Sequence, residues 1–156
     1  MPSNALPRTR ARRRQVAAAV LFGFAFMIAG AALFQRSTLG ISAALMAVGL
    51  PLGVGGAFVL RSLTGRMAGD GRDLDERETP LRNAAHYRSF QAFGMLMLVD
   101  LAYGLLVAGR PEAGSLTSSM TAALFLLGTA MPALTLAWSL PDDDPEDFVT
   151  TPPRAA

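Results

Sequence analysis

The chain has 156 residues, of which 51% are hydrophobic and 17% charged, and its formal net charge is +2. It is richer in apolar residues and poorer in charges than a typical soluble domain, and its length allows one domain. The absence of cysteine excludes disulfides, thiolate nucleophiles and thiolate metal sites. A nucleic-acid-binding role is excluded as well, because no soluble basic domain carries the small net charge.

Residues 1–15 form a basic N-terminal segment that we expect to lie in the cytoplasm and to contact anionic lipids of the bilayer. The arginines of this segment are Arg8, Arg10, Arg12, Arg13 and Arg14. The apolar stretch that follows is longer than the apolar core of a signal peptide, and Leu33 and Phe34 continue it past the small residues Ala29-Gly30-Ala31. We therefore interpret it as an uncleaved membrane span.

The segment 16–140 contains four apolar stretches, at about residues 16–34, 39–60, 90–108 and 118–140. Each is close to the ~20 residues that a helix needs to cross the hydrocarbon core of a bilayer. None has the alternation of polar and apolar faces that is typical of a soluble helix. Backbone groups in lipid must bond within the chain, which favours helices, and the internal Pro51 and Pro132 are tolerated there. The sequence predicts an all-α, integral-membrane four-helix bundle.

The second apolar stretch carries small residues about one turn apart. Gly49, Gly53 and Gly56 form a candidate helix-packing seam, through which two helix backbones can approach closely. The partner is either another helix of this chain or a second copy, and the pattern leaves both open.

The predicted cytoplasmic loop, residues 61–89, holds six arginines, and the orientation of the spans follows from them. They are Arg61, Arg66, Arg72, Arg77, Arg82 and Arg88. The two short connections have one arginine each, Arg36 and Arg110. Because arginine-rich segments stay in the cytoplasm, we expect a bacterial inner-membrane protein with both termini inside.

The same loop carries a short motif before the third apolar stretch. Leu74-Asp75-Glu76-Arg77-Glu78, with Arg82 and then Phe90-Gln91 at the start of the membrane helix, resembles a loop of small uncharacterised prokaryotic four-helix membrane proteins. The resemblance implies a membrane topology and no activity.

Asp100 lies inside the third apolar stretch and is the candidate intramembrane polar site. An acid at the centre of a span costs ~2.5–3.5 kcal/mol, so its side chain should face protein or water. One interpretation is a proton or cation site. The other is a hydrogen-bonded tie between helices. The candidate partners for such a tie are Thr129, Thr135, Ser42 and Tyr103.

The spans contain no cluster of acids, histidines or nucleophiles that would indicate catalysis, a metal or a cofactor. His86 stands alone, Trp138 is placed as an interfacial anchor, and residues 141–156 form an acidic tail that we expect to be disordered. Small multidrug transporters are excluded, since their membrane carboxylate lies in the first helix and this first span has no acid. We expect a non-enzymatic structural or interaction subunit, in a homo-oligomer or a larger membrane complex. The alternative is a small proton- or cation-coupled transporter that uses Asp100.

Reporter fusions test the predicted topology. A reporter that fluoresces only in the cytoplasm should be bright when fused after Ser139 or near Gly71, because arginine-rich segments resist translocation. Alkaline phosphatase fused near Gly114 should be active, since that connection is predicted to lie outside. Active phosphatase at Gly71 would overturn the orientation.

Overall fold

The computed structural model describes residues 10–33, 39–68, 74, 76 and 78–140. In this part of the chain every element is helical and no strand is present. The elements are α1 (Arg10–Leu33), α2 (Leu39–Leu50), the π-helix η1 (Pro51–Gly55), α3 (Gly56–Thr64), the 3-10 helix η2 (Gly65–Ala68), α4 (Glu78–Val107) and α5 (Ala113–Ser139). The expectations for Arg8, Arg36 and the acidic tail lie outside the described residues.

The described residues contain four helical segments that are long and apolar enough to cross a membrane. They are Arg10–Leu33, Gly40–Thr64, Glu78–Val107 and Ala113–Ser139. The predicted all-α class is thereby confirmed. The third segment begins twelve residues before the apolar stretch, at Glu78. Pro80 does not stop it, because the first turn of a helix needs no intrahelical acceptor for its N–H groups.

The second apolar segment is one continuous helix in which α2 passes through η1 into α3. The π-helical turn begins at Pro51, which has no N–H to donate to the preceding turn. Widening the helix by one residue at that point accommodates the missing bond. Regular α-helix resumes at Gly56 and ends where Gly65 adopts a positive φ of 60°.

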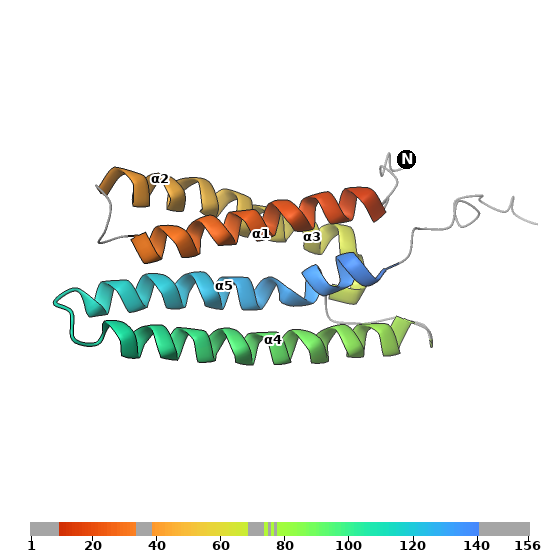
Figure 1. Cartoon of the computed structure of the whole chain (residues 1–156). Coiled ribbons are helices and arrows are strands. Elements are labelled where there is room, and N and C mark those ends of the chain that lie inside the picture. Colours follow the sequence, from red (N-terminus) through yellow and green to blue (C-terminus); the bar gives the residue numbers. More distant parts are fainter. Residues whose placement is uncertain (1–9, 34–38, 69–73, 75, 77, 141–156) are drawn as a thin grey trace, which may run out of the picture.

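The helices α2, α1, α5 and α4 lie side by side in that order, and α3 packs against both α1 and α5 (Figure 1). The two inner helices, α1 and α5, have neighbours on both sides, whereas the main neighbour of α4 among the described elements is α5. In the most apolar stretch of α5, 56% of the residues are buried, whereas in that of α4 only 6% are buried. The core therefore lies along α1 and α5, and α4 is the least buried of the four membrane-length segments.

Close backbone contact joins α1 to the second segment. A Cβ added at Gly23 would lie 2.7 Å from Cα of Gly53, and one added at Gly49 would lie 2.7 Å from the carbonyl oxygen of Gly23. Carbon atoms at optimal contact are ~3.5–4.0 Å apart, so only glycine fits at both positions. The buried hydroxyl of Ser42 donates to the carbonyl oxygen of Gly30 at 2.8 Å and adds a polar bond to this interface.

An aromatic contact joins α4 to α5. The ring of Phe93 lies directly against Gly128, where a Cβ would overlap it. Phe93 also meets Phe125 edge to face, with ring centroids 6.0 Å apart. Because α4 has no other large neighbour, these residues hold most of it in place.

Alanine substitution tests the contact between α1 and the second segment. Gly49→Ala should lower the free energy of unfolding by about 1–3 kcal/mol, because the methyl group would overlap backbone atoms of α1. Gly55→Ala is the matched control, since a Cβ there meets nothing within 4 Å. Thermal unfolding in mild detergent measures both. Equal stability of the two variants would contradict the close packing.

Candidate functional site

Asp100 lies in the last third of α4, near the middle of its apolar stretch and between two arginines. It follows Arg88 by twelve residues and precedes Arg110 by ten. At ~1.5 Å per residue, Arg88 is about 18 Å away along the helix axis, and the end of α4 at Val107, just before Arg110, is about 10 Å away. A hydrocarbon core of ~30 Å would fit between the two arginines, with Asp100 close to its centre.

One oxygen of the Asp100 carboxylate bonds to α5. The hydroxyl of Thr121 donates to Oδ2 at 2.8 Å. Thr121 is not one of the four partners suggested by the sequence, so that expectation was wrong. Three of those residues bond elsewhere: Thr129 to the carbonyl oxygen of Leu126, Ser42 to that of Gly30, and Thr135 to Ser89.

The geometry of the α4–α5 hairpin explains the choice of partner. The two helices run antiparallel from a short connection around Arg110, so residues equally far from that connection face each other. Asp100 lies ten residues before Arg110 and Thr121 eleven after it. The same rule brings Phe93 to Gly128. The predicted loop was too long to give this pairing, because counting outward from spans that end at 108 and begin at 118 places Asp100 opposite residue 126.

The second oxygen of Asp100 differs from the first. Oδ1 is shielded from solvent and has no hydrogen-bond partner among the described residues. A buried acceptor without a donor is costly, so this atom retains the capacity to bind a proton, a cation or a donor from another helix.

The seam glycines face α1 of the same chain. A Cβ at Gly53 would lie 3.3 Å from the backbone N of Phe24, and one at Gly56 would lie 2.8 Å from a methyl carbon of Val20. With Gly49 packed on Met27, all three residues lie in an internal interface. The sequence left open whether the seam packs against another helix of this chain or against a second copy, and in the structure it packs against α1 of the same chain.

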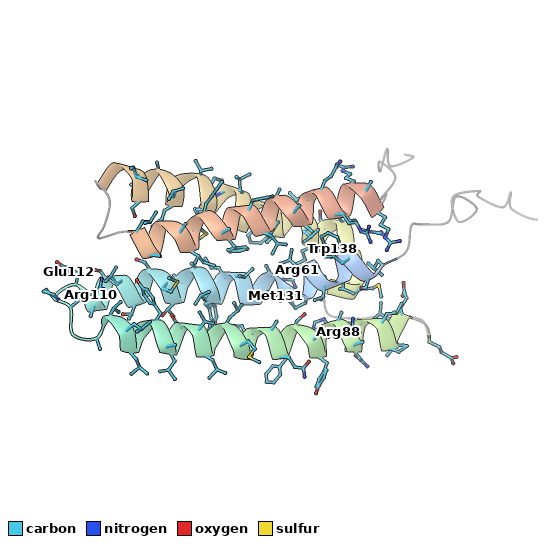
Figure 2. All side chains as sticks on the ribbon, in the orientation of Figure 1. Arg61, Arg88, Arg110, Glu112, Met131 and Trp138 are labelled. Carbon is cyan, nitrogen blue, oxygen red and sulfur yellow. The ribbon has the colours of Figure 1, made fainter. Side chains whose placement is uncertain are left out.

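The helix ends opposite the α4–α5 connection carry an arginine-rich contact between α1 and α5. Arg13 is only 2% exposed, and its Nη2 donates to the carbonyl oxygen of Leu140 at 3.1 Å. The guanidinium of Arg14 lies over the ring of Trp138, 5.1 Å from its centroid. Figure 2 shows Trp138, Arg61 and Arg88 toward this end of the molecule and Arg110 and Glu112 at the other. We call this side the arginine-rich end.

A hydroxyl pair closes the α4–α5 interface near the same end. Ser89 donates to the carbonyl oxygen of Ala85 at 2.6 Å, and its oxygen lies 3.1 Å from that of Thr135. Thr135 also lies 3.0 Å from the carbonyl oxygen of Met131 on its own helix. Both hydroxyls are thus satisfied within the protein.

The described helices have hollows between them, of which three are lined by residues relevant to a site. One of about 160 Å³ lies between α1, α3 and α5 and includes Arg61 and Thr129 in its wall. A groove of about 520 Å³ lies mainly between α4 and α5 and includes Arg88 and Trp138. An apolar groove of about 430 Å³ lies between α1 and α2. Asp100 lines none of the three.

The described residues hold no group of three or more histidine, cysteine and acidic side chains that could bind a metal. His86 is half-buried on α4. Comparison with protein-family models, with curated proteins and with solved structures found no match to this chain.

Proposed function

We propose that this chain is a non-enzymatic interaction subunit of the bacterial inner membrane, with both termini in the cytoplasm. The charge distribution supports the orientation. Figure 2 labels Arg61 and Arg88 toward the arginine-rich end, where α1 and α4 also begin. The first two turns of these helices add Arg10, Arg12, Arg13, Arg14 and Arg82 to this end. Among the described arginine side chains, Arg110 is the one at the opposite end. Basic side chains are retained on the cytoplasmic side, so this asymmetry favours an arginine-rich end that faces inward.

The observation that carries the interaction role is the unenclosed face of α4. Of the 30 residues of this helix, only Ala85, Ser89 and Val107 are buried. Many of the others are large apolar side chains, and the most exposed of these are Phe90, Met95, Leu105 and Leu106. A helix with a single neighbour can accept a second one without disturbing the bundle.

The composition of that face favours a protein partner in addition to lipid. Gln91 is exposed one turn inside Arg88, and Gly94 on the same face has open space around its Cα. In a bilayer, a side-chain amide gains from bonding across helices, and a glycine lets a second backbone approach. The seam glycines of the second span already contact α1, so they do not offer a second copy a close backbone approach.

A second copy of the chain is the partner that we favour. Two-fold dimers that pair equivalent surfaces are the commonest homo-oligomers among soluble proteins, and by the same geometry one copy's α4 would lie against the other's. Leu98 is 61% exposed near the middle of α4 and would lie close to that axis.

Single-cysteine cross-linking tests this proposal, because the chain has no cysteine of its own. Leu98→Cys, treated in membranes with a short bismaleimide, should yield a covalent dimer. Val48→Cys is the matched control, since Val48 is a 48% exposed residue on α2, at the other edge of the row. It should remain monomeric.

Two further outcomes of the cross-linking experiment are decisive. An adduct of Leu98→Cys with a different, stoichiometric protein would identify a larger complex at the same face. No adduct at Leu98, or equal dimer formation by both variants, would contradict an α4 interface.

The competing function is a small proton- or cation-coupled transporter, and the unpartnered Oδ1 of Asp100 is the observation that favours it. Asp100→Asn retains an oxygen that accepts the Thr121 hydroxyl, but it cannot take up and release a proton. Transport by Asp100 therefore predicts that this variant loses proton-coupled flux in liposomes while expression and thermal stability stay unchanged.

Thr121→Val separates that function from a structural one. If Asp100 is a helix tie, removing its donor should lower stability by roughly 0.6–1.7 kcal/mol, as for other hydrogen bonds between membrane helices. A transporter should keep its flux in this variant. Loss of stability in Asp100→Asn, without any flux in the parent protein, would eliminate the transporter.

A further inference from the structure

The groove between α4 and α5 combines an apolar wall with a polar mouth at the arginine-rich end. Its apolar lining comes from three helices: Leu21 of α1, Leu81 of α4, and Met131 and Leu134 of α5. Its volume of about 520 Å³ falls within the ~300–1,000 Å³ that is typical of ligand-binding clefts.

Arg88 is the charged group of the groove. Its side chain is exposed, and it forms no hydrogen bond or ion pair with the residues that the structure describes. A guanidinium binds a phosphodiester through two parallel hydrogen bonds, which gives stronger and more directional recognition than a lysine would. Arg88 is thus available to an anion at the mouth.

Trp138 links the groove to a second cation. Its ring lines the groove, is 48% exposed, and carries the Arg14 guanidinium 5.1 Å from its centroid. Tryptophan sits at the level of lipid headgroups in membrane proteins, because its ring is apolar and its N–H is polar. The mouth therefore has positive charge from α1 and α4 and an aromatic surface between lipid and water.

The apolar wall extends away from this mouth toward the middle of the bundle. Met131 precedes Trp138 by seven residues, and Leu21 follows Arg14 by seven. At ~1.5 Å per residue, both lie about 10 Å deeper than the charged level. Thr135, the hydroxyl between these levels, is already bonded to Ser89 and needs no polar ligand. An acyl chain can cross that part of the groove without leaving a polar atom unsatisfied.

We propose that this groove is a binding site for one anionic glycerophospholipid of the leaflet at the arginine-rich end. Arg88 bonds the phosphodiester of the headgroup, and an acyl chain lies along Leu21, Met131 and Leu134. A free phosphate would use only the mouth, whereas the depth and the apolar lining match a ligand that has a tail.

The single tryptophan gives a direct assay, because its ring lines the groove and no other tryptophan contributes to the fluorescence. The full chain is reconstituted in phosphatidylcholine vesicles that contain a small fraction of a lipid with brominated acyl chains. Brominated phosphatidylglycerol should quench Trp138 at a lower mole fraction than brominated phosphatidylcholine does. Equal quenching by the two lipids would overturn the proposal.

Arg88→Gln is the test variant and Arg61→Gln is the matched control. Both remove one positive charge at the same end, but Arg61 lines a different hollow. We expect Arg88→Gln to weaken the preference for phosphatidylglycerol about tenfold, as for loss of a charge-assisted hydrogen bond. Arg61→Gln should lower it by at most the general surface effect of one arginine, about fivefold. Equal effects of the two variants would mean that surface charge alone attracts the lipid.

Two additions distinguish the lipid from its headgroup and test the apolar wall. Inorganic phosphate should not relieve the quenching, and relief by phosphate would assign the site to a soluble anion instead. Ala84→Phe, which fills the groove from an exposed position on α4, should abolish the preference while Arg88 is retained. An unchanged preference in a folded Ala84→Phe protein would contradict binding in the groove.

Discussion

Antiparallel packing of α4 on α5 is the constraint on which the polar chemistry of this protein depends. The short connection around Arg110 sets the register, and the register decides that Asp100 meets Thr121 and that Ser89 meets Thr135. Had the connection been one turn longer, these pairs would slide past each other and leave the Asp100 carboxylate without its donor, whereas Ser89 and Thr135 would keep bonds to carbonyl oxygens of their own helices. In a medium without water, a carboxylate has no alternative donor. The hairpin thus makes a mid-span acid tolerable.

A second constraint acts on the other half of the molecule, where glycine backbones bring α1 and the second segment together. Gly23, Gly49 and Gly53 remove the side chains that would hold the helices apart, and the buried Ser42 bond closes the interface. Since apolar side chains gain little by leaving lipid for protein, close van der Waals contact and interhelical bonds are the main sources of stability there. This use of the seam has a consequence for assembly. The small residues that could favour self-association already pack against α1 of the same chain. The exposed side of α4 is the surface on which we propose that a partner packs.

The arginines at the arginine-rich end contribute to the predicted topology and also to helix packing. Arginines are the residues that hold a segment in the cytoplasm, yet those of α1 are also parts of the packed structure. Arg13 bonds the end of α5, and Arg14 covers Trp138. Long side chains with charged tips can do both, because their aliphatic stems lie on apolar surface while the guanidinium reaches the interface. With Arg88 at the mouth of the neighbouring groove, the same end offers both an anchor for the fold and a place for an anionic lipid.

The sequence alone determined the helical class and the number of apolar segments, because the length of an apolar run and the lack of charge within it are properties of neighbouring residues. It also singled out Asp100 and the seam glycines, since an acid or a small-residue repeat in such a run is unusual wherever the helix packs. The partners of those residues were decided only by the tertiary structure. Thr121 was missed because a polar residue on a lipid-length helix has several equivalent candidates until the helix pairing is known. The seam could have served a second copy as well as α1, since small residues favour close approach by any helix. The outer position of α4 and the groove beside Arg88 depend on which helices are neighbours, and local apolar pattern carries no information on that order.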